Sequence, residues 1–203
     1  RLASRVLVRL ASFAARDFAT LEKQAARVPW ASVIAPGMRV RLRVTCRKSR
    51  LYHSDAVAER VARGITGALP TVVIEGRARD DEDESSEDGP AVASQLIVVR
   101  IDRDQCTISA DSSGALLHRR GWRQAVAKAP LRETLAALML AGLGWDGTEP
   151  LVDPFCGSGT IGIEAALFAR RIAPGLHRSF AMEQWPHAVT ADYARVRESA
   201  QAM

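Results

Sequence analysis

Residues 150–167 are the part of the sequence whose residue types best suit ligand binding. An apolar pair before Asp153 predicts the end of a short strand, which Pro154 cannot continue because proline lacks an N–H. Gly157 and Gly159 predict a turn without bulky side chains, so that a ligand can approach the backbone closely. The helix expected next would direct its unpaired N–H groups and the positive end of its dipole at that ligand, which favours an anion.

The glycine spacing by itself admits two other interpretations. Gly157, Gly159 and Gly162 match G-x-G-x-x-G, a pattern that also occurs in dinucleotide-binding loops and is weak when it stands alone. The same residues could form a tight turn between a strand and a helix that binds nothing. NAD(P) binding and a purely structural turn are therefore the alternatives for this stretch.

The residues that flank the glycines narrow the choice. Asp-Pro-Phe-Cys-Gly-Ser-Gly-Thr resembles the first motif of class I methyltransferases that use S-adenosylmethionine (SAM) and methylate exocyclic amino groups. In that family the glycine turn approaches the methionine part of SAM. The resemblance implies that SAM is the cofactor and that its contacts are Asp153, Pro154, Phe155, Cys156, Gly157, Ser158, Gly159 and Thr160.

An acid further along the chain could complete this site. Residues 179–182 predict the second strand of a parallel pair, and Glu183 would then stand at its carboxyl end, 24 positions after Gly159. An acid at such a place can accept hydrogen bonds from a ribose diol. We expect this role for Glu183, with an ordinary surface acid as the alternative.

The charge distribution indicates a polyanionic partner. Residues 1–60 hold 13 Lys and Arg against four acids, although the net charge of the whole chain is +5. One run, residues 80–88, holds seven of the 23 acids and no large apolar residue, so we expect a solvated surface insertion there. The basic remainder favours RNA as a partner, and a merely soluble basic protein is the alternative.

Two basic segments are candidates for RNA contact. The first is a loop that follows a strand predicted over residues 39–46, on which arginines alternate with apolar residues. The second is a basic run that contains Trp122 and suits a groove with one stacking platform. A solvated sheet face and a connector with a buried tryptophan are the alternatives. The candidate RNA contacts are Arg47, Lys48, Arg50, His118, Arg119, Arg120 and Arg123.

Periodicity predicts an α+β unit followed by a second unit. Strands near residues 5–10, 39–46, 71–75, 95–101 and 105–110 and helices near 17–27 and 54–65 give the order β-α-β-α-β-β-β, typical of a small α+β domain. Trp30 is expected to pack back onto the core. The second unit should contain helices from about 129 to 142, from 161 and in the last residues, with short strands near 150–152 and 179–182.

Composition excludes several other classes of protein. No window reaches the ~18 apolar residues of a membrane span, and no signal peptide is evident. Cys46, Cys106 and Cys156 are isolated, and the four histidines are scattered. We therefore expect reduced thiols in a cytosol and no metal site.

Four blocks together resemble the THUMP-domain RNA methyltransferases of the bacterial 23S rRNA guanine-N2 type. They are residues 1–5, 129–137 with the lead-in 118–122, 153–160, and 173–178. The resemblance implies an α+β THUMP RNA-binding domain over residues 1–120, with a remnant of a preceding ferredoxin-like segment. It implies the N-terminal part of an α/β Rossmann-like class I methyltransferase domain over residues 121–203. The implied reaction is methylation of guanine N2 in 23S rRNA by SAM in the cytoplasm, with tRNA as the other candidate substrate.

One motif of that family is absent. Its Asn/Asp-Pro-Pro-aromatic sequence, which holds the target amine, does not occur in this chain. We therefore expect the chain to be a fragment, inactive by itself, with the catalytic residues beyond Met203. A non-catalytic RNA-binding module with a structural glycine loop is the main alternative. An NAD(P) oxidoreductase is disfavoured, because nothing in the sequence argues for a hydride-accepting substrate site.

Overall fold

The chain divides into two compact units, each of which is described by itself. The sheet unit comprises Val6–Gly114 and Phe180–Ala188. The helical unit comprises Arg1–Arg5, Ala115–Ser179 and Val189–Met203. The structure, a computed structural model, describes residues 1–77, 94–122 and 131–202. The features predicted at residues 80–88 and at Arg123, Ala129 and Pro130 lie outside these ranges.

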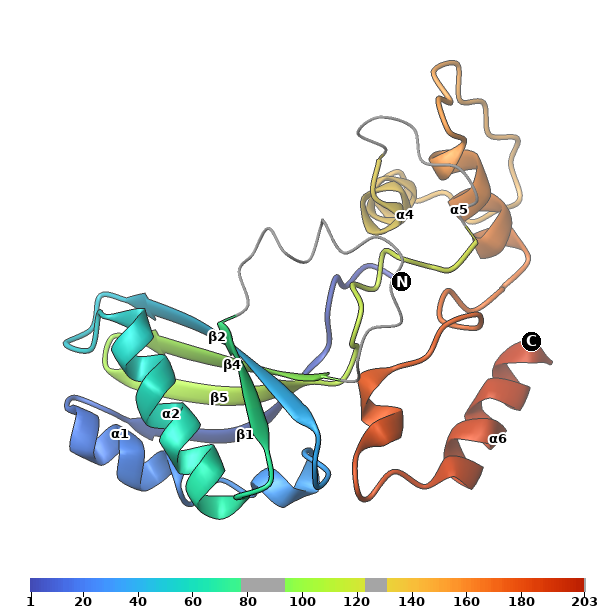
Figure 1. Cartoon of the computed structure of the whole chain (residues 1–203). Coiled ribbons are helices and arrows are strands. Elements are labelled where there is room, and N and C mark those ends of the chain that lie inside the picture. The colour runs from blue at the N-terminus through green and yellow to red at the C-terminus, as the bar shows by residue number, and fades with distance from the viewer. Residues whose placement is uncertain (78–93, 123–130, 203) are drawn as a thin grey trace. The chain divides into compact units, whose positions relative to one another are not determined.

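A five-stranded sheet forms the centre of the sheet unit (Figure 1). Its strand order is β1-β5-β4-β2-β3. β5 pairs antiparallel with both β1 and β4, whereas β2 runs parallel to β3 and to β4. The strands are β1 (Leu7–Ala14), β2 (Arg39–Arg47), β3 (Val73–Arg77), β4 (Ser94–Asp102) and β5 (Gln105–Asp111). The predicted order β-α-β-α-β-β-β is confirmed.

Two helices, α1 (Phe18–Ala25) and α2 (Ser54–Ala68), cover one face of this sheet (Figure 1). The core lies between them and the sheet, where the apolar residues of β2 alternate inward because strand side chains have a period of two. Trp30 belongs to this core, as predicted, and its indole N–H donates to the carbonyl of Ala25 at 2.8 Å. The opposite face of the sheet carries the arginines of β2.

The first strand differs from its prediction. Val6, Val8 and Leu10 were expected on one apolar face, but Val6 and Val8 are exposed. The pairing of β1 with β5 shifts between Arg9 and Ala11. Such a bulge inserts one residue and exchanges the faces of the residues after it. The core side of the strand therefore passes from Val8, opposite buried Ala110, to Ala11, opposite buried Ile108.

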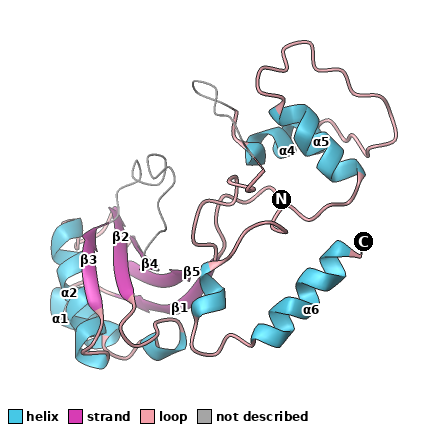
Figure 2. Cartoon of the chain, turned by 45° about the vertical axis from the view of Figure 1, so that its right-hand side comes forward, coloured by secondary structure: helices cyan, strands magenta, loops and turns pink. Residues whose placement is uncertain are grey.

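The helical unit contains α4 (Glu133–Gly142), α5 (Thr160–Ala169) and α6 (Thr190–Gln201). α4 packs against α5. Strands were predicted near residues 150–152 and 179–182, but both segments are drawn as loop or helix in Figure 2, and the strands of the described residues all belong to the five-stranded sheet. A strand needs a neighbour to satisfy its backbone groups, and no described residue pairs with either segment. A short 3₁₀ helix, η2 (Ala181–Gln184), stands in the second place and belongs to the sheet unit.

None of the helices in the described part of the chain is long and apolar enough to cross a membrane.

Candidate functional site

The glycine-rich turn Asp153–Thr160 has the backbone conformation that its sequence predicts. Gly157 and Gly159 have φ values of +52° and +75°, in the left-handed region that glycine adopts without strain. Gly159 is the N-cap of α5, and it closes the turn by donating its N–H to the carbonyl of Cys156 at 2.7 Å. The turn therefore leads directly into the helix, as the motif requires.

The outer side of this turn is open. A Cβ built on Gly157 would meet no atom closer than 4.0 Å, and one built on Gly159 only a side-chain carbon of Ile163 at 3.8 Å. Phe155 is 92% exposed, and the Cys156 side chain is exposed too. The positive φ values of Gly157 and Gly159 thus explain why glycine occupies these positions, and the open space around them leaves the backbone accessible to a ligand.

One polar atom in the turn lacks a partner. Asp153 accepts a hydrogen bond from the N–H of Phe155 through Oδ1, at 3.1 Å. Its Oδ2 is buried and accepts no hydrogen bond from any described residue. A buried carboxylate oxygen without a donor is costly, so it calls for a ligand or a water molecule with a free hydrogen.

The N-terminus of α5 adds a second polar feature beside the turn. No side chain caps it, so the first turn of the helix can attract a negatively charged group. Thr160 is buried at the first helical position, and its hydroxyl lies 3.2 Å from that of Ser158. The turn Asp153–Thr160 therefore offers two kinds of contact. Oδ2 of Asp153 can accept a hydrogen bond from a cationic or N–H group, and the N-terminus of α5 can attract an anion.

The third glycine of the G-x-G-x-x-G match behaves differently. Gly162 has open space where its Cβ would be, and its φ is not positive. In the dinucleotide fingerprint the third glycine serves close packing of the helix on its strand. Gly162 meets no such packing among the described residues, so the geometry offers no support for a dinucleotide-type loop.

A buried acid behind the turn was missed by sequence reasoning. Glu164 is on α5, and its side chain is completely buried. Its Oε1 accepts from Nε of Arg120 at 3.2 Å, and its Oε2 accepts from Nη1 of Arg1 at 3.4 Å. The signal was present, because Glu164 is the one charged residue of an otherwise apolar helix, and buried charges are nearly always paired.

This network changes the role of Arg120, which was a candidate RNA contact. Arg120 is only 4% exposed. Besides Glu164, its guanidinium donates to the carbonyls of Leu117 and Arg1, both at 2.7 Å. The donors of Arg120 are directed at protein acceptors, so this residue holds the lead-in segment and the first residues of the chain against α5.

A second arginine holds the lead-in segment from the other side. Arg178 donates to the carbonyls of Ala115, Leu116 and Arg119 at 2.6, 2.8 and 3.2 Å. At Gly121, with φ +86°, a Cβ would lie 3.0 Å from the carbonyl of His177. The segments around residues 115–122 and 173–178 therefore pack tightly together.

The structure thus brings the four blocks of the family resemblance into one compact unit. Residues 1–5, 118–122, the described part of 129–137, 153–160 and 173–178 all belong to the helical unit. The remaining candidates of the lead-in, His118 and Arg119, are half-buried there. The glycine-rich turn and the other three blocks therefore belong to the same compact unit.

Glu183, the candidate ribose ligand, belongs to the sheet unit. Its Oε1 accepts from the N–H of Phe180 at 2.5 Å, which caps η2. Beside it, the indole N–H of Trp185 donates to Oε1 of Gln95 at 2.7 Å. The ribose role of Glu183 stays a prediction.

The other candidate RNA contacts also lie in the sheet unit. Arg47 ends β2, and Lys48 and Arg50 follow in the exposed turn. Lys48 has φ +47°, and the N–H of Arg50 donates to Oδ1 of Asp104 at 2.8 Å. No group of metal-ligating side chains occurs among the residues that the structure describes.

Comparison with known proteins adds independent findings. Residues 120–203 match the family model of UPF0020, an RMKL-like methyltransferase domain. The chain is 37% identical over 185 residues to YpsC of Bacillus subtilis, whose name assigns it to the RNA methyltransferases. It is 40% identical over 185 residues to the ribosomal RNA large subunit methyltransferase K/L of Syntrophotalea carbinolica. Both relatives are thus named as RNA methyltransferases.

The chain is shorter than these relatives. The match to YpsC covers 91% of this chain and 46% of YpsC, and the match to the K/L enzyme covers 89% and 24%. The chain thus spans less than half of either relative.

Solved structures share its mixed α/β fold. A predicted N6-adenine-specific DNA methylase from Listeria monocytogenes superposes with a TM-score of 0.83 at 31% identity, over 100% of this chain and 51% of that one. The methyltransferase-like protein SMU.472, crystallised with S-adenosylhomocysteine (SAH), superposes with a TM-score of 0.78 at 29% identity, over 98% and 50%.

Proposed function

We propose that this chain carries the methyl-donor site of an RNA methyltransferase that uses SAM. The observation that carries the proposal is the turn Asp153–Thr160, which combines an accessible glycine backbone, an orphan carboxylate oxygen and an uncapped helix N-terminus. The crystal structure of SMU.472 with SAH and the matches to RNA methyltransferases support it.

The residues of the turn fit the methionine end of SAM. That end carries an ammonium group and a carboxylate. The ammonium can donate to Oδ2 of Asp153, which has no other donor among the described residues, and the carboxylate suits the positive end of α5. Bound SAM supplies an electrophilic methyl group on a sulfonium, whose transfer to an amine leaves SAH and releases one proton.

The remaining assignments complete the proposal. We assign the ribose of SAM to Glu183 and the sheet unit to a THUMP-type RNA-binding role. The substrate that best fits the K/L relative is an exocyclic amine of large-subunit ribosomal RNA, with guanine N2 as the specific target. We assign no catalytic residue within residues 1–203.

Titration calorimetry with SAM and SAH tests the cofactor site. Gly159→Ala forces a Cβ into a left-handed conformation at φ +75° and should weaken binding about tenfold or more, since misplacing a turn of this kind by about 1 Å costs ~10²-fold in positioned sites. Gly142→Ala is the matched control, because Gly142 lies in α4 with open space around it. Unchanged SAM affinity of Gly159→Ala, or no SAM binding by the native protein, would refute the site.

Alkylation of Cys156 gives a second readout. Cys156 is exposed in the middle of the turn, so bound SAH should slow its reaction with iodoacetamide, as followed by mass spectrometry. Equal rates with and without saturating SAH would contradict the assignment. The RNA target is tested separately, by methyl transfer from labelled SAM with the full-length gene product and 23S rRNA that lacks guanine-N2 methylation.

A second candidate function is a non-catalytic RNA-binding module. It is favoured by the absence of a strand before Asp153 and by the nearly complete exposure of Phe155. This module would bind RNA with a steep salt dependence and would show no heat of binding with SAM. The calorimetry above therefore separates the two functions.

A further inference from the structure

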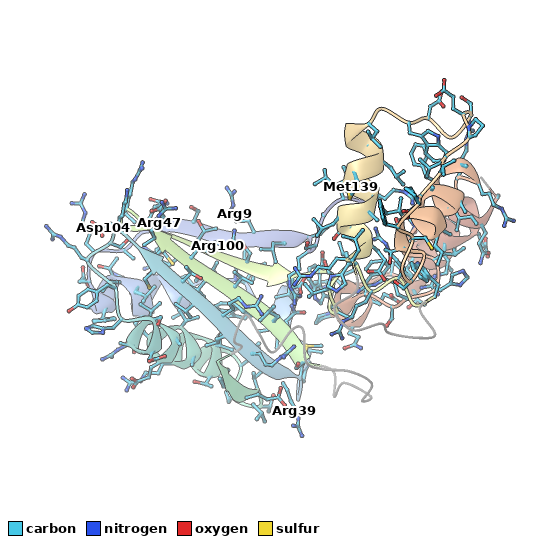
Figure 3. All side chains as sticks on the ribbon, turned by 90° about the horizontal axis from the view of Figure 1, so that it is seen from above. Arg9, Arg39, Arg47, Arg100, Asp104 and Met139 are labelled. Carbon is cyan, nitrogen blue, oxygen red and sulfur yellow. The ribbon has the colours of Figure 1, made fainter. Side chains whose placement is uncertain are left out.

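The sheet face opposite α1 and α2 carries an unusual set of arginines. Arg9, Arg47 and Arg100 come from β1, β2 and β4, and all three are exposed. None of the three guanidinium groups forms a hydrogen bond or an ion pair with a described residue. Figure 3 shows the three side chains at the same end of the sheet. We call this the open arginine face.

The strand registers place these arginines on one face of the sheet, in three neighbouring rows. Arg100 lies opposite Thr45 of β2 on one side and Thr107 of β5 on the other. Arg9 lies opposite Ser109 of β5. Residues in register share a face, and so do residues two positions apart along a strand. The three arginines therefore lie on one face that extends from β2 through β4 and β5 to β1. Three strand spacings make it about 14 Å wide, enough to follow several phosphates of a nucleic acid strand.

Several arginines elsewhere on the sheet unit form ion pairs. Arg60 pairs with Glu22 at 2.9 Å, and Arg63 pairs with Glu59 at 2.5 Å, both outside the open face. Arg39, at the far end of β2, pairs with Glu75 at 2.8 Å. Asp102 lies opposite Arg47 in register, but the two form no ion pair. The open arginine face thus carries three arginines that form no ion pair with a described residue.

Further arginines extend the positive charge along β2. Arg41 and Arg43 are half-buried, and they lie in register with Leu96 and Val98 of β4. Leu96 and Val98 are themselves buried. Long arginine stems can cover apolar residues in this way, and here the Nε atoms of both arginines are buried as well. The face therefore combines an apolar floor with cationic heads.

We propose that the open arginine face binds the phosphate backbone of RNA. Arginine forks match phosphate oxygens with two parallel hydrogen bonds. The hydroxyls of Thr107 and Ser12, which lie in register with Arg100, add neutral phosphate donors. Such contacts position a nucleic acid without reading its sequence. The proposal rests on the RNA methyltransferase function proposed above and specifies where the RNA is held.

The test measures RNA binding by fluorescence anisotropy in the absence of SAM. The triple variant Arg9→Gln, Arg47→Gln, Arg100→Gln is compared with the control triple Arg16→Gln, Arg60→Gln, Arg63→Gln, which removes the same charge. A labelled 23S rRNA fragment should bind the first variant about 10- to 100-fold more weakly at 100 mM salt, and the slope of log K against log salt should fall by about 2. The control should change affinity by less than about threefold.

Several outcomes overturn the proposal. These are equal losses in the two triple variants, no RNA binding by the native protein, or tighter binding of poly-glutamate than of RNA at this face. The charge-preserving triple Arg9→Lys, Arg47→Lys, Arg100→Lys should keep the salt slope and lose less affinity than the Gln triple, because it keeps the charge and loses only the paired hydrogen bonds. SAM calorimetry on the same samples separates a failure of the RNA-binding proposal from a failure of the proposed function, because it tests the SAM site independently of RNA.

Discussion

Glu164 shows how a single buried charge organises the helical unit. It is the only carboxylate that Arg120 contacts among the described residues, and Arg1 shares it. Burial of an ion pair rarely adds net stability, but removal of one partner strands the other charge in the interior. Glu164 therefore determines that the segments of Arg1 and Arg120 pack against α5, and it adds little to the net stability of that packing.

Glu164→Ala should destabilise the helical unit by about 3–5 kcal/mol, because two arginines lose their buried partner. Glu164→Gln should cost less, since the amide oxygen still accepts a hydrogen bond. Urea unfolding, followed by hydrogen exchange of α5, measures both. Glu198→Gln on the exposed side of α6 is the control. Similar stability of Glu164→Ala and the control would mean that the network is dispensable.

Cys106 makes stability depend on alkaline pH. Burial of its thiol, with a smaller effect of Cys46, raises the pKa of Cys106 from 9.0 to about 12. The folded state thus holds a proton that the unfolded state releases above pH 9. The stabilising contribution is complete below about pH 9 and is lost as the pH rises toward 12.

The test compares melting temperatures of the native protein and Cys106→Ala between pH 8 and 11. The advantage of the native protein should shrink as pH rises, because only its unfolded state gains the thiolate. In the same samples at pH 8, a thiol reagent should modify Cys156 quickly and leave Cys106 unmodified. A constant difference in melting temperature across this range contradicts the assignment.

At the scale of elements, the contact between α1 and α2 depends on one glycine. A Cβ on Gly64 would lie 2.9 Å from the Cβ of Ala25 and 3.0 Å from its carbonyl carbon. Neither neighbour is the end of a flexible side chain. Small residues at this crossing therefore allow the helices to approach closely.

Gly64→Ala should destabilise the sheet unit by about 1–3 kcal/mol through overpacking. Gly67→Ala in the same helix is the matched control, because a Cβ there meets nothing within 4 Å. It should be neutral or stabilise by up to about 1 kcal/mol, since alanine favours the helix. Thermal unfolding measures the two variants, and destabilisation by both or by neither would argue against a steric cause.

Local patterns predicted the sheet unit well. The strand at Arg39–Arg47 and the burial of Trp30 followed from alternation and from a chain break at Pro29. Asp17 begins α1 and accepts the N–H of Thr20 at 2.7 Å, as a good N-cap does. Such features depend on residues a few positions apart, so a single sequence contains them.

Features that depend on distant partners were not predicted. The burial of Arg120 depends on Glu164, which is 44 positions away. The bulge between Arg9 and Ala11, which moves the core side of β1 by one residue, arises only in pairing with β5. The strand expected before Asp153 did not form, because strand formation depends on a neighbouring strand. In the candidate site, the turn and its glycines were predictable, whereas the acid behind them was not.

At the scale of the whole molecule, α4 exposes an apolar face. Leu135, Leu138, Met139 and Leu143 recur at helical spacing, and Leu143 is 74% exposed. Figure 3 shows Met139 on the outer side of α4. The other side of the helix is buried against α5. A contiguous apolar face of this kind attracts partners or promotes association.

The double variant Leu138→Glu, Met139→Lys should reduce the binding of the dye ANS and the tendency to aggregate, without a change in circular dichroism. The reason is that both side chains are about half exposed, at 52% and 51%, and lose little packing. Tyr52→Lys, at an exposed site in the sheet unit, is the control and should leave dye binding unchanged. Equal dye binding by all three proteins would mean that this face does not attract apolar ligands.

The sheet unit is completed by residues that the ribosome makes far apart in time. β1 pairs with β5, and Leu7 lies opposite Asp111. At about 5–20 residues per second, the synthesis of the residues between them takes roughly 5–20 s. Phe180–Ala188 arrive later still, after α4 and α5, and bring the Trp185 indole to Gln95. During synthesis the pairing edge of β1 and the amide of Gln95 are therefore open to other chains. A nascent polypeptide of this kind is a natural client for chaperones that shield strand edges until the last segment emerges.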